Sequence, residues 1–215
     1  MYKRQYIDRT IIRNLEEPFE AVGGLVALYG NLAPDGAILK RSAADPTLFE
    51  YTGRAVVFES LEDLANRIDS DDLDVQADDI LVLKNAGPKS HSGMPEAGYI
   101  PIPKKLAEAG IKDMVRISDC RMSGTAFGTI ILHVTPEAAI GGSIGLVHNG
   151  DEISLSVSNK SLNLNVPKEI LDQRKRNTKS RQATPDRGYA WLYAKHVTQA
   201  NQGVEFDFLM PKAST

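Results

Sequence analysis

The chain contains a single cysteine, Cys120, among its 215 residues. One thiol excludes an internal disulfide bond, and it excludes a zinc or iron–sulfur site made from several cysteines of this chain alone. Cys120 follows an expected strand and has no base evident beside it. The sequence therefore favours a passive thiol, with a reactive nucleophile as the weaker alternative.

Long apolar runs are also missing. The longest, such as residues 129–134, fall far short of the roughly 20 residues that a transmembrane helix needs. Residues 1–13 mix charges with scattered apolar side chains and lack the apolar region of a signal peptide. We therefore expect a soluble, cytoplasmic protein that does not associate with a membrane.

Neither sign of charge is in large excess. The 25 Lys and Arg residues against 28 Asp and Glu residues give a net charge of −3, so a concentrated basic surface for nucleic acid is not expected. Hydrophobic residues make up 42% of the chain, which excludes disorder as a description of the whole. We expect one domain over residues 1–215, in which residues 175–215 form a polar tail and a terminal helix.

Glycine and proline divide the chain into short apolar runs, which are typical of buried strands. The expected strands are residues 24–30, 54–58, 79–83, 114–118, 128–134, 143–147 and 152–157. Asn149-Gly150 predicts a hairpin turn between the last two. Helices are expected at residues 60–68, 103–109, 135–139, 167–174 and 189–199. The predicted fold class is α+β, a strand-rich, barrel-like domain with a mainly antiparallel or mixed sheet flanked by helices.

Three loops combine glycine with polar side chains at the ends of expected strands, where binding sites are often built. They are residues 30–36, 87–96 and 119–128. The second loop presents His91, Ser92 and Glu96, and the third presents Ser123 and Thr125 on either side of a glycine. Each loop is also compatible with a purely structural turn.

The sequence argues against a self-sufficient serine hydrolase, because it contains no Gly-x-Ser-x-Gly turn. An unperturbed serine hydroxyl is too weak an acid to act as a base or nucleophile without an activating neighbour.

Four longer motifs occur in a distinctive order. They are Gly30-Asn31-Leu32-Ala33-Pro34-Asp35-Gly36, Gly93-Met94-Pro95-Glu96, Ser118-Asp119-Cys120-Arg121-Met122-Ser123-Gly124-Thr125 and His133-Val134-Thr135-Pro136-Glu137-Ala138-Ala139. Together they resemble the C-terminal domain of the dihydroxy-acid dehydratase/phosphogluconate dehydratase family. Residues 122–129 are most similar to the sugar-acid branch, such as arabinonate or xylonate dehydratases.

The resemblance implies a swivelling, β-barrel-like domain of an enzyme that removes water from 2,3-dihydroxy acids and yields 2-keto-3-deoxy acids. It implies that Ser123 is the base that takes the C2 proton and that Glu96 helps to hold Mg²⁺. Thr125, Ser92 and His91 are the expected substrate contacts. The complete enzyme would also use a [2Fe-2S] cluster, whose cysteines belong to an N-terminal domain, and neither cofactor is expected to bind this chain tightly by itself.

The expected partners are therefore an N-terminal dehydratase domain or subunit, a small sugar acid and further copies of the chain in a homo-oligomer. We expect the isolated chain to be inactive and to expose an apolar surface that the partner domain would cover. The alternative is a non-catalytic binding or assembly module derived from such a domain.

Overall fold

The computed structural model describes residues 8–90, 93–96, 100–124, 127–177 and 185–210. Its strands are β1 (Val26–Leu28), β2 (Gly36–Leu39), β3 (Glu50–Phe58), β4 (Ile80–Leu83), β5 (Arg116–Ser118), β6 (Ile130–Thr135), β7 (Glu152–Ser156) and β8 (Ser161–Leu164). Its α-helices are α1 (Leu61–Arg67), α2 (Lys104–Glu108), α3 (Lys168–Asn177) and α4 (Gly188–His196). Short 3₁₀ helices are η1 (Arg41–Ala43), η2 (Pro46–Leu48), η3 (Ala138–Ile140), η4 (Ser143–Leu146), η5 (Ala200–Gln202) and η6 (Asp207–Leu209).

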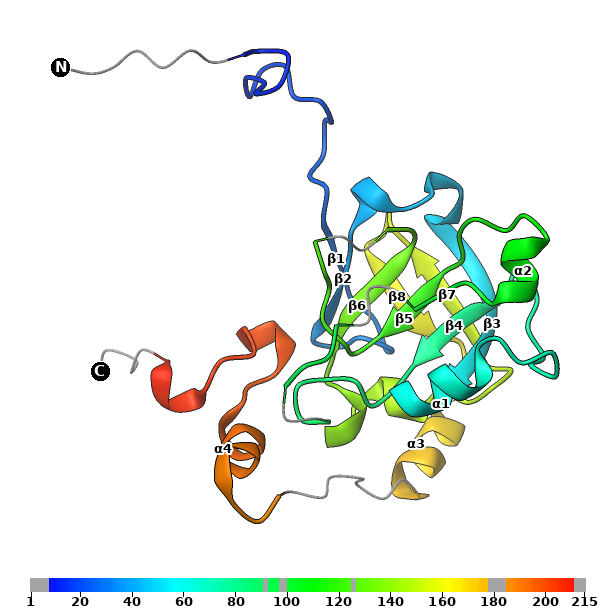
Figure 1. The fold of residues 1–215 in the computed structure, drawn as a ribbon, viewed down its shortest axis with the longest axis vertical. Helices are drawn as coiled ribbons and strands as arrows, with labels where there is room; N and C mark the ends of the chain where they lie inside the picture. Colours follow the sequence, from blue (N-terminus) through cyan, green and yellow to red (C-terminus); the bar gives the residue numbers. More distant parts are fainter. Residues whose placement is uncertain (1–7, 91–92, 97–99, 125–126, 178–184, 211–215) are drawn as a thin grey trace.

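The strands form one mixed sheet in the order β1-β2-β6-β5-β4-β3-β7-β8. Its central strands β6, β5, β4 and β3 are parallel, and the pairs on either side are antiparallel. The two edges meet, because Tyr29 N donates to Lys160 O at 2.9 Å and Leu162 N donates to Tyr29 O at 2.8 Å. The sheet thus curves around one interior (Figure 1), and the predicted strand-rich α+β barrel-like fold is confirmed.

The apolar runs are continuous because the central strands are buried on both faces. In β4, Ile80 and Val82 belong to the cluster inside the barrel, whereas Leu81 and Leu83 belong to a second cluster outside it. Leu64 of α1 covers the outer cluster. Within the part of the chain that the structure describes, no helix has the length and apolar character needed to cross a bilayer.

Several predicted helices are present with shifted ends. Helix α1 begins after Ser60, whose hydroxyl accepts a hydrogen bond from Asp63 N as the sequence pattern predicts. Helix α2 is followed by Gly110, which has a φ of 92°. The helix expected at residues 135–139 is instead the short η3, because β6 continues through Thr135 and delays its start.

The prediction of a strand at residues 143–147 is wrong, because residues Ser143–Leu146 form η4. Ile144 and Val147 are nevertheless buried in the cluster inside the barrel. The run thus buries its side chains in the core without joining the sheet. An apolar run by itself does not distinguish these two outcomes.

The turn at Asn149-Gly150 consequently joins η4 to β7 and is not the predicted hairpin. The Asn149 side chain instead accepts a hydrogen bond from Val57 N at 2.6 Å. Its role is to extend the hydrogen bonding of β3.

Candidate active site

Ser123 lies on the segment that connects β5 to β6, beside a cavity of about 510 Å³. The cavity is lined by Gly24, Leu25, Ile38, Lys40, Ser42, Met122, Ser123, Gly124 and His133. The cavity therefore presents a hydroxyl, an ammonium group and an imidazole from Ser123, Lys40 and His133. This set can bind an anion or a polar ligand and can accept or donate a proton.

Hydrogen bonds hold the backbone on both sides of Ser123. On the N-terminal side, Met122 N donates to His133 Nε2 at 2.9 Å. On the C-terminal side, Lys40 Nζ donates to Gly124 O at 2.7 Å. Further along, Phe127 O accepts from Arg116 Nη2 at 3.1 Å, so the end of the turn is also attached to β5.

His133 occupies a β-bulge where β6 pairs with β2. Two residues, His133 and Val134, lie opposite Ala37, and His133 has a left-handed φ of 57°. Burial lowers the pKa of the imidazole, and the positive charge of Arg121 lowers it further. The ring is therefore neutral at pH 7, and because Nε2 accepts a hydrogen bond, Nδ1 carries the proton.

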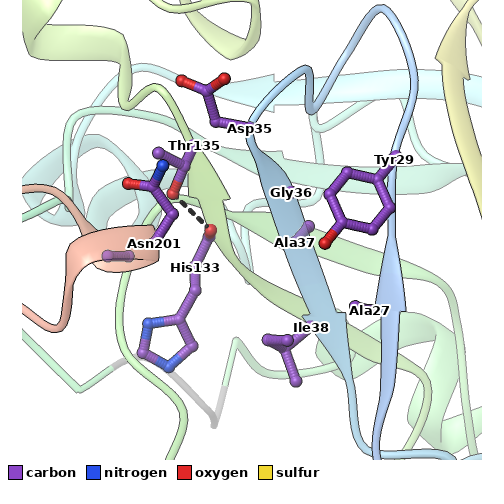
Figure 2. A pocket seen from close by; sticks show the side chains of 10 residues that line it. Ala27, Tyr29, Asp35, Gly36, Ala37, Ile38, His133, Thr135 and Asn201 are labelled. Atoms are coloured by element: carbon purple, nitrogen blue, oxygen red, sulfur yellow. Dashed lines mark hydrogen bonds between the residues drawn. The ribbon is translucent and has the colours of Figure 1, made fainter.

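A second cavity of about 350 Å³ lies next to the first and shares Ile38 and His133 with it. Figure 2 shows Tyr29, Asp35, Thr135 and Asn201 around it, with Asn201 coming from η5 near the C-terminus. Thr135 Oγ1 donates to His133 O at 2.8 Å, as the dashed line marks. His133 thus borders both cavities.

Glu96 lies beside the strand-end segment that leads to Ser123. Glu96 forms a parallel bridge with Arg121, and Arg121 N donates to Pro95 O at 3.2 Å. The structure therefore brings the Glu96 and Ser123 segments together, with Arg121 only two residues before Ser123. His91, Ser92 and Thr125 lie outside the described residues.

The loop that leads to Glu96 is anchored by a buried carboxylate, Glu137, whose exposed fraction is 1%. Glu137 Oε1 accepts from Lys89 N at 2.9 Å and from Gln199 Nε2 at 2.7 Å, and Glu137 Oε2 accepts from Ser90 Oγ at 3.2 Å. Glu137 thus connects η3, the loop and the C-terminal segment.

Asp119 is fully buried next to this anchor. Its carboxyl group accepts from Ala86 N at 2.9 Å and from Ala138 N at 2.8 Å. Burial raises the pKa of Asp119 to about 7, the two backbone N–H groups oppose the rise, and the neighbouring Glu137 charge adds to it. The bonds to Ala86 and Ala138 hold the start of the Ser123 turn against both neighbouring segments.

The sequence did not single out Lys40 or assign a role to His133, Asp119 or Glu137. The last three lie within the motifs quoted above, and each is a polar residue inside or next to an apolar run. The signal that could have identified them is a polar side chain at a position that the hydrophobic pattern places in the core.

The described residues do not form a complete metal centre, since they contain no group of three His, Cys, Asp or Glu side chains placed to hold an ion. The single cysteine is buried, which does not fit the several thiolates that an iron–sulfur cluster needs. A carboxylate such as Glu96 fits one ligand position of Mg²⁺, so the remaining ligands would have to come from elsewhere.

A family model for the dihydroxy-acid/6-phosphogluconate dehydratase C-terminal domain matches residues 10–204 of the chain. The chain is 49% identical over 205 residues to a 6-deoxy-6-sulfo-D-gluconate dehydratase of Pseudomonas putida, a match that covers 94% of the chain and 35% of the relative. It is 48% identical to an L-arabinonate dehydratase of Rhizobium leguminosarum, over 93% of the chain and 34% of the relative. The chain therefore spans about a third of the length of these relatives.

Proposed function

The chain belongs to the dihydroxy-acid/6-phosphogluconate dehydratase family as its C-terminal domain, and from this premise we propose that it forms one side of the active site of a sugar-acid dehydratase. The observation that carries the proposal is the position of Ser123, which is half-buried and lines a cavity together with Lys40 and His133. Two relatives are named as dehydratases of 6-deoxy-6-sulfo-D-gluconate and of L-arabinonate, and these names support a sugar acid as substrate.

In the proposed reaction, Ser123 acts as an alkoxide and takes the proton from C2 of a 2,3-dihydroxy acid. The electron pair of that C–H bond forms a C2=C3 double bond, the C3–O bond breaks, and the hydroxide leaves as water after gaining a proton. The resulting enol gains a proton at C3 and loses one from its C2 hydroxyl, which yields the 2-keto-3-deoxy acid.

This role requires a positive field at the Ser123 oxygen, because a serine alkoxide is otherwise far too basic to form. Lys40, which lines the same cavity, supplies one positive charge from this chain. Thr125, Ser92 and His91 are proposed to contact the substrate, and Glu96 is proposed to hold Mg²⁺.

The [2Fe-2S] cluster and the other Mg²⁺ ligands are proposed to belong to an N-terminal dehydratase domain, since the described residues of this chain do not fit either group alone. That domain is the expected partner, and a homo-oligomer is the expected assembly. The partial coverage of the relatives supports a further domain in the working enzyme.

The test is Ser123→Ala in the enzyme assembled with its N-terminal domain, assayed for 2-keto-3-deoxy acid formation from sugar acids. We expect a loss of about 10²- to 10⁴-fold in kcat, the usual contribution of a general base. Folding should be unchanged because a half-buried hydroxyl in a turn leaves no cavity. Ser158→Ala, at an exposed position between β7 and β8, is the matched control. Wild-type turnover of Ser123→Ala would show that the turn is structural and would overturn the assignment.

A further inference from the structure

The Ser123 turn is open on one side, at Gly124. A Cβ added at Gly124 would meet no atom within 4 Å, so this side of the turn faces open space. Packed neighbours usually hold a catalytic side chain in place. Here hydrogen bonds to the flanking backbone groups also hold the turn in place.

Two of those bonds come from side chains on neighbouring strands of the barrel. His133 of β6 accepts from Met122 N through Nε2, and Lys40, directly after β2, donates to Gly124 O. One bond thus fixes the residue before Ser123 and the other fixes the residue after it. Both side chains also line the Ser123 cavity.

His133 is itself held in place from two sides. Its backbone N donates to Cys120 O at 2.9 Å, and its carbonyl accepts from Thr135 Oγ1 at 2.8 Å. The imidazole lies at the bulge and lines both cavities, and Figure 2 shows it among the residues around the second. A left-handed backbone at a residue other than glycine is costly and tends to occur at functional sites.

We propose that Lys40 and His133 are positioning residues that clamp the two sides of the Ser123 turn, so that the Ser123 hydroxyl is presented to the substrate at a fixed place. The proposal rests on the proposed function of Ser123. A displacement of about 1 Å in a reacting group can cost on the order of 10²-fold in rate. The clamp therefore acts on kcat through Ser123.

The first test measures the clamp without any activity. In the isolated ¹⁵N-labelled chain, hydrogen exchange of the Met122 amide should be at least 10-fold faster in His133→Leu than in the wild type. His133→Gln should restore slow exchange, because its Oε1 can accept the same hydrogen bond. Unchanged exchange in a folded His133→Leu chain would overturn the proposal for His133.

The second test uses the assembled enzyme. Lys40→Met should lower kcat at least 10-fold and change KM less than 3-fold, and Lys40→Arg should recover part of kcat because it keeps a charged donor. Lys112→Met, which removes the same charge at an exposed position before β5, should leave kcat unchanged.

The outcomes separate the clamp from the proposed function. If Ser123→Ala is inactive while folded Lys40→Met retains wild-type kcat, the clamp is wrong for Lys40 and the proposed function stands. If Ser123→Ala is fully active, the proposed function fails, and the Met122 exchange experiment still decides whether His133 holds the turn. A fall in kcat that Lys40→Arg does not relieve at all would also contradict the proposed hydrogen bond.

Discussion

The carboxyl group of Asp119 is fully buried. Its titration predicts how the stability of the fold depends on pH. Its pKa rises from an ordinary value of 3.8 to about 7 on folding, chiefly through burial. Between these values the folded chain holds a proton that the unfolded chain has released. The stabilisation from this group is therefore complete below the unfolded pKa and is lost as pH rises through the folded pKa.

We expect the free energy of unfolding in urea to be lower at pH 8 than at pH 5 by at least about 1 kcal/mol from this group, since one pKa unit corresponds to about 1.4 kcal/mol. Asp119→Asn should remove this component because an amide does not titrate. Asp172→Asn, at an exposed position of α3, should keep the wild-type slope. Equal slopes for wild type and Asp119→Asn would contradict the raised pKa.

Glu96 allows a test of the proposed metal contact that differs from the test of Ser123. Glu96→Gln should weaken Mg²⁺ binding in the assembled enzyme about 10-fold or more, because a neutral amide is a poorer ligand for a hard cation. Excess Mg²⁺ should restore part of the activity of Glu96→Gln and none of that of Ser123→Ala. An activity of Glu96→Gln that does not depend on Mg²⁺ concentration would exclude this role.

Among the secondary-structure elements, η3 and η4 depend on one close backbone approach. A Cβ added at Gly142 would lie 1.7 Å from Pro136 O, although Gly142 does not have a left-handed φ. At this contact the chain folds back between the two short helices, and Ile144 of η4 lies in the cluster inside the barrel. Glycine is therefore required at position 142 because a side chain would not fit there, and not because of its backbone conformation.

Gly142→Ala should destabilise the chain by roughly 3 kcal/mol or more, because the overlap forces η3 and η4 apart. Gly124→Ala is the matched control, since its added Cβ meets nothing within 4 Å, and its stability should stay within about 0.5 kcal/mol of the wild type. Urea unfolding measures both. A Gly142→Ala variant of wild-type stability would show that the backbone relaxes easily at this contact.

At the scale of the whole molecule, residues 8–25 lead away from the barrel (Figure 1) and expose large apolar side chains. These are Ile11, Ile12, Leu15, Phe19, Val22 and Leu25. Exposed apolar side chains concentrated on one segment usually mark a surface that another protein covers. This agrees with the exposed apolar surface expected for the isolated chain.

The isolated chain should therefore associate as its concentration rises, and sedimentation should show species heavier than the 23.5 kDa chain. The double variant Leu15→Asp/Phe19→Asp should remain monomeric, with its stability within about 0.5 kcal/mol of the wild type, since these positions are exposed. Asn66→Asp/Gln173→Asp adds the same charge at exposed polar positions and should still associate. A wild-type chain that is monomeric at high concentration would contradict this prediction.

The sequence predicted the central strands and the larger helices because their signals are local. The runs around Val82 and Ile117 are apolar enough for burial on both faces, and Ser60 caps α1 by itself. It did not predict β2 or β8. β8 alternates Ser161, Leu162, Asn163 and Leu164 over only four residues, and it becomes a strand because β7 and the end of β1 pair with it.

By itself the sequence determined the fold class, the family resemblance and the order of the motifs, because periodicity, caps and motif spacing are properties of neighbouring residues. Only the tertiary structure decided that residues 143–147 would not be a strand, since Ile144 and Val147 are buried in the cluster inside the barrel without pairing to another strand. It alone placed Lys40 and His133 on either side of Ser123, 83 and 10 residues away along the chain. The physical reason is that sheet pairing brings β2 and β6 side by side across long sequence distances, and no local pattern encodes which backbone group a side chain will meet there.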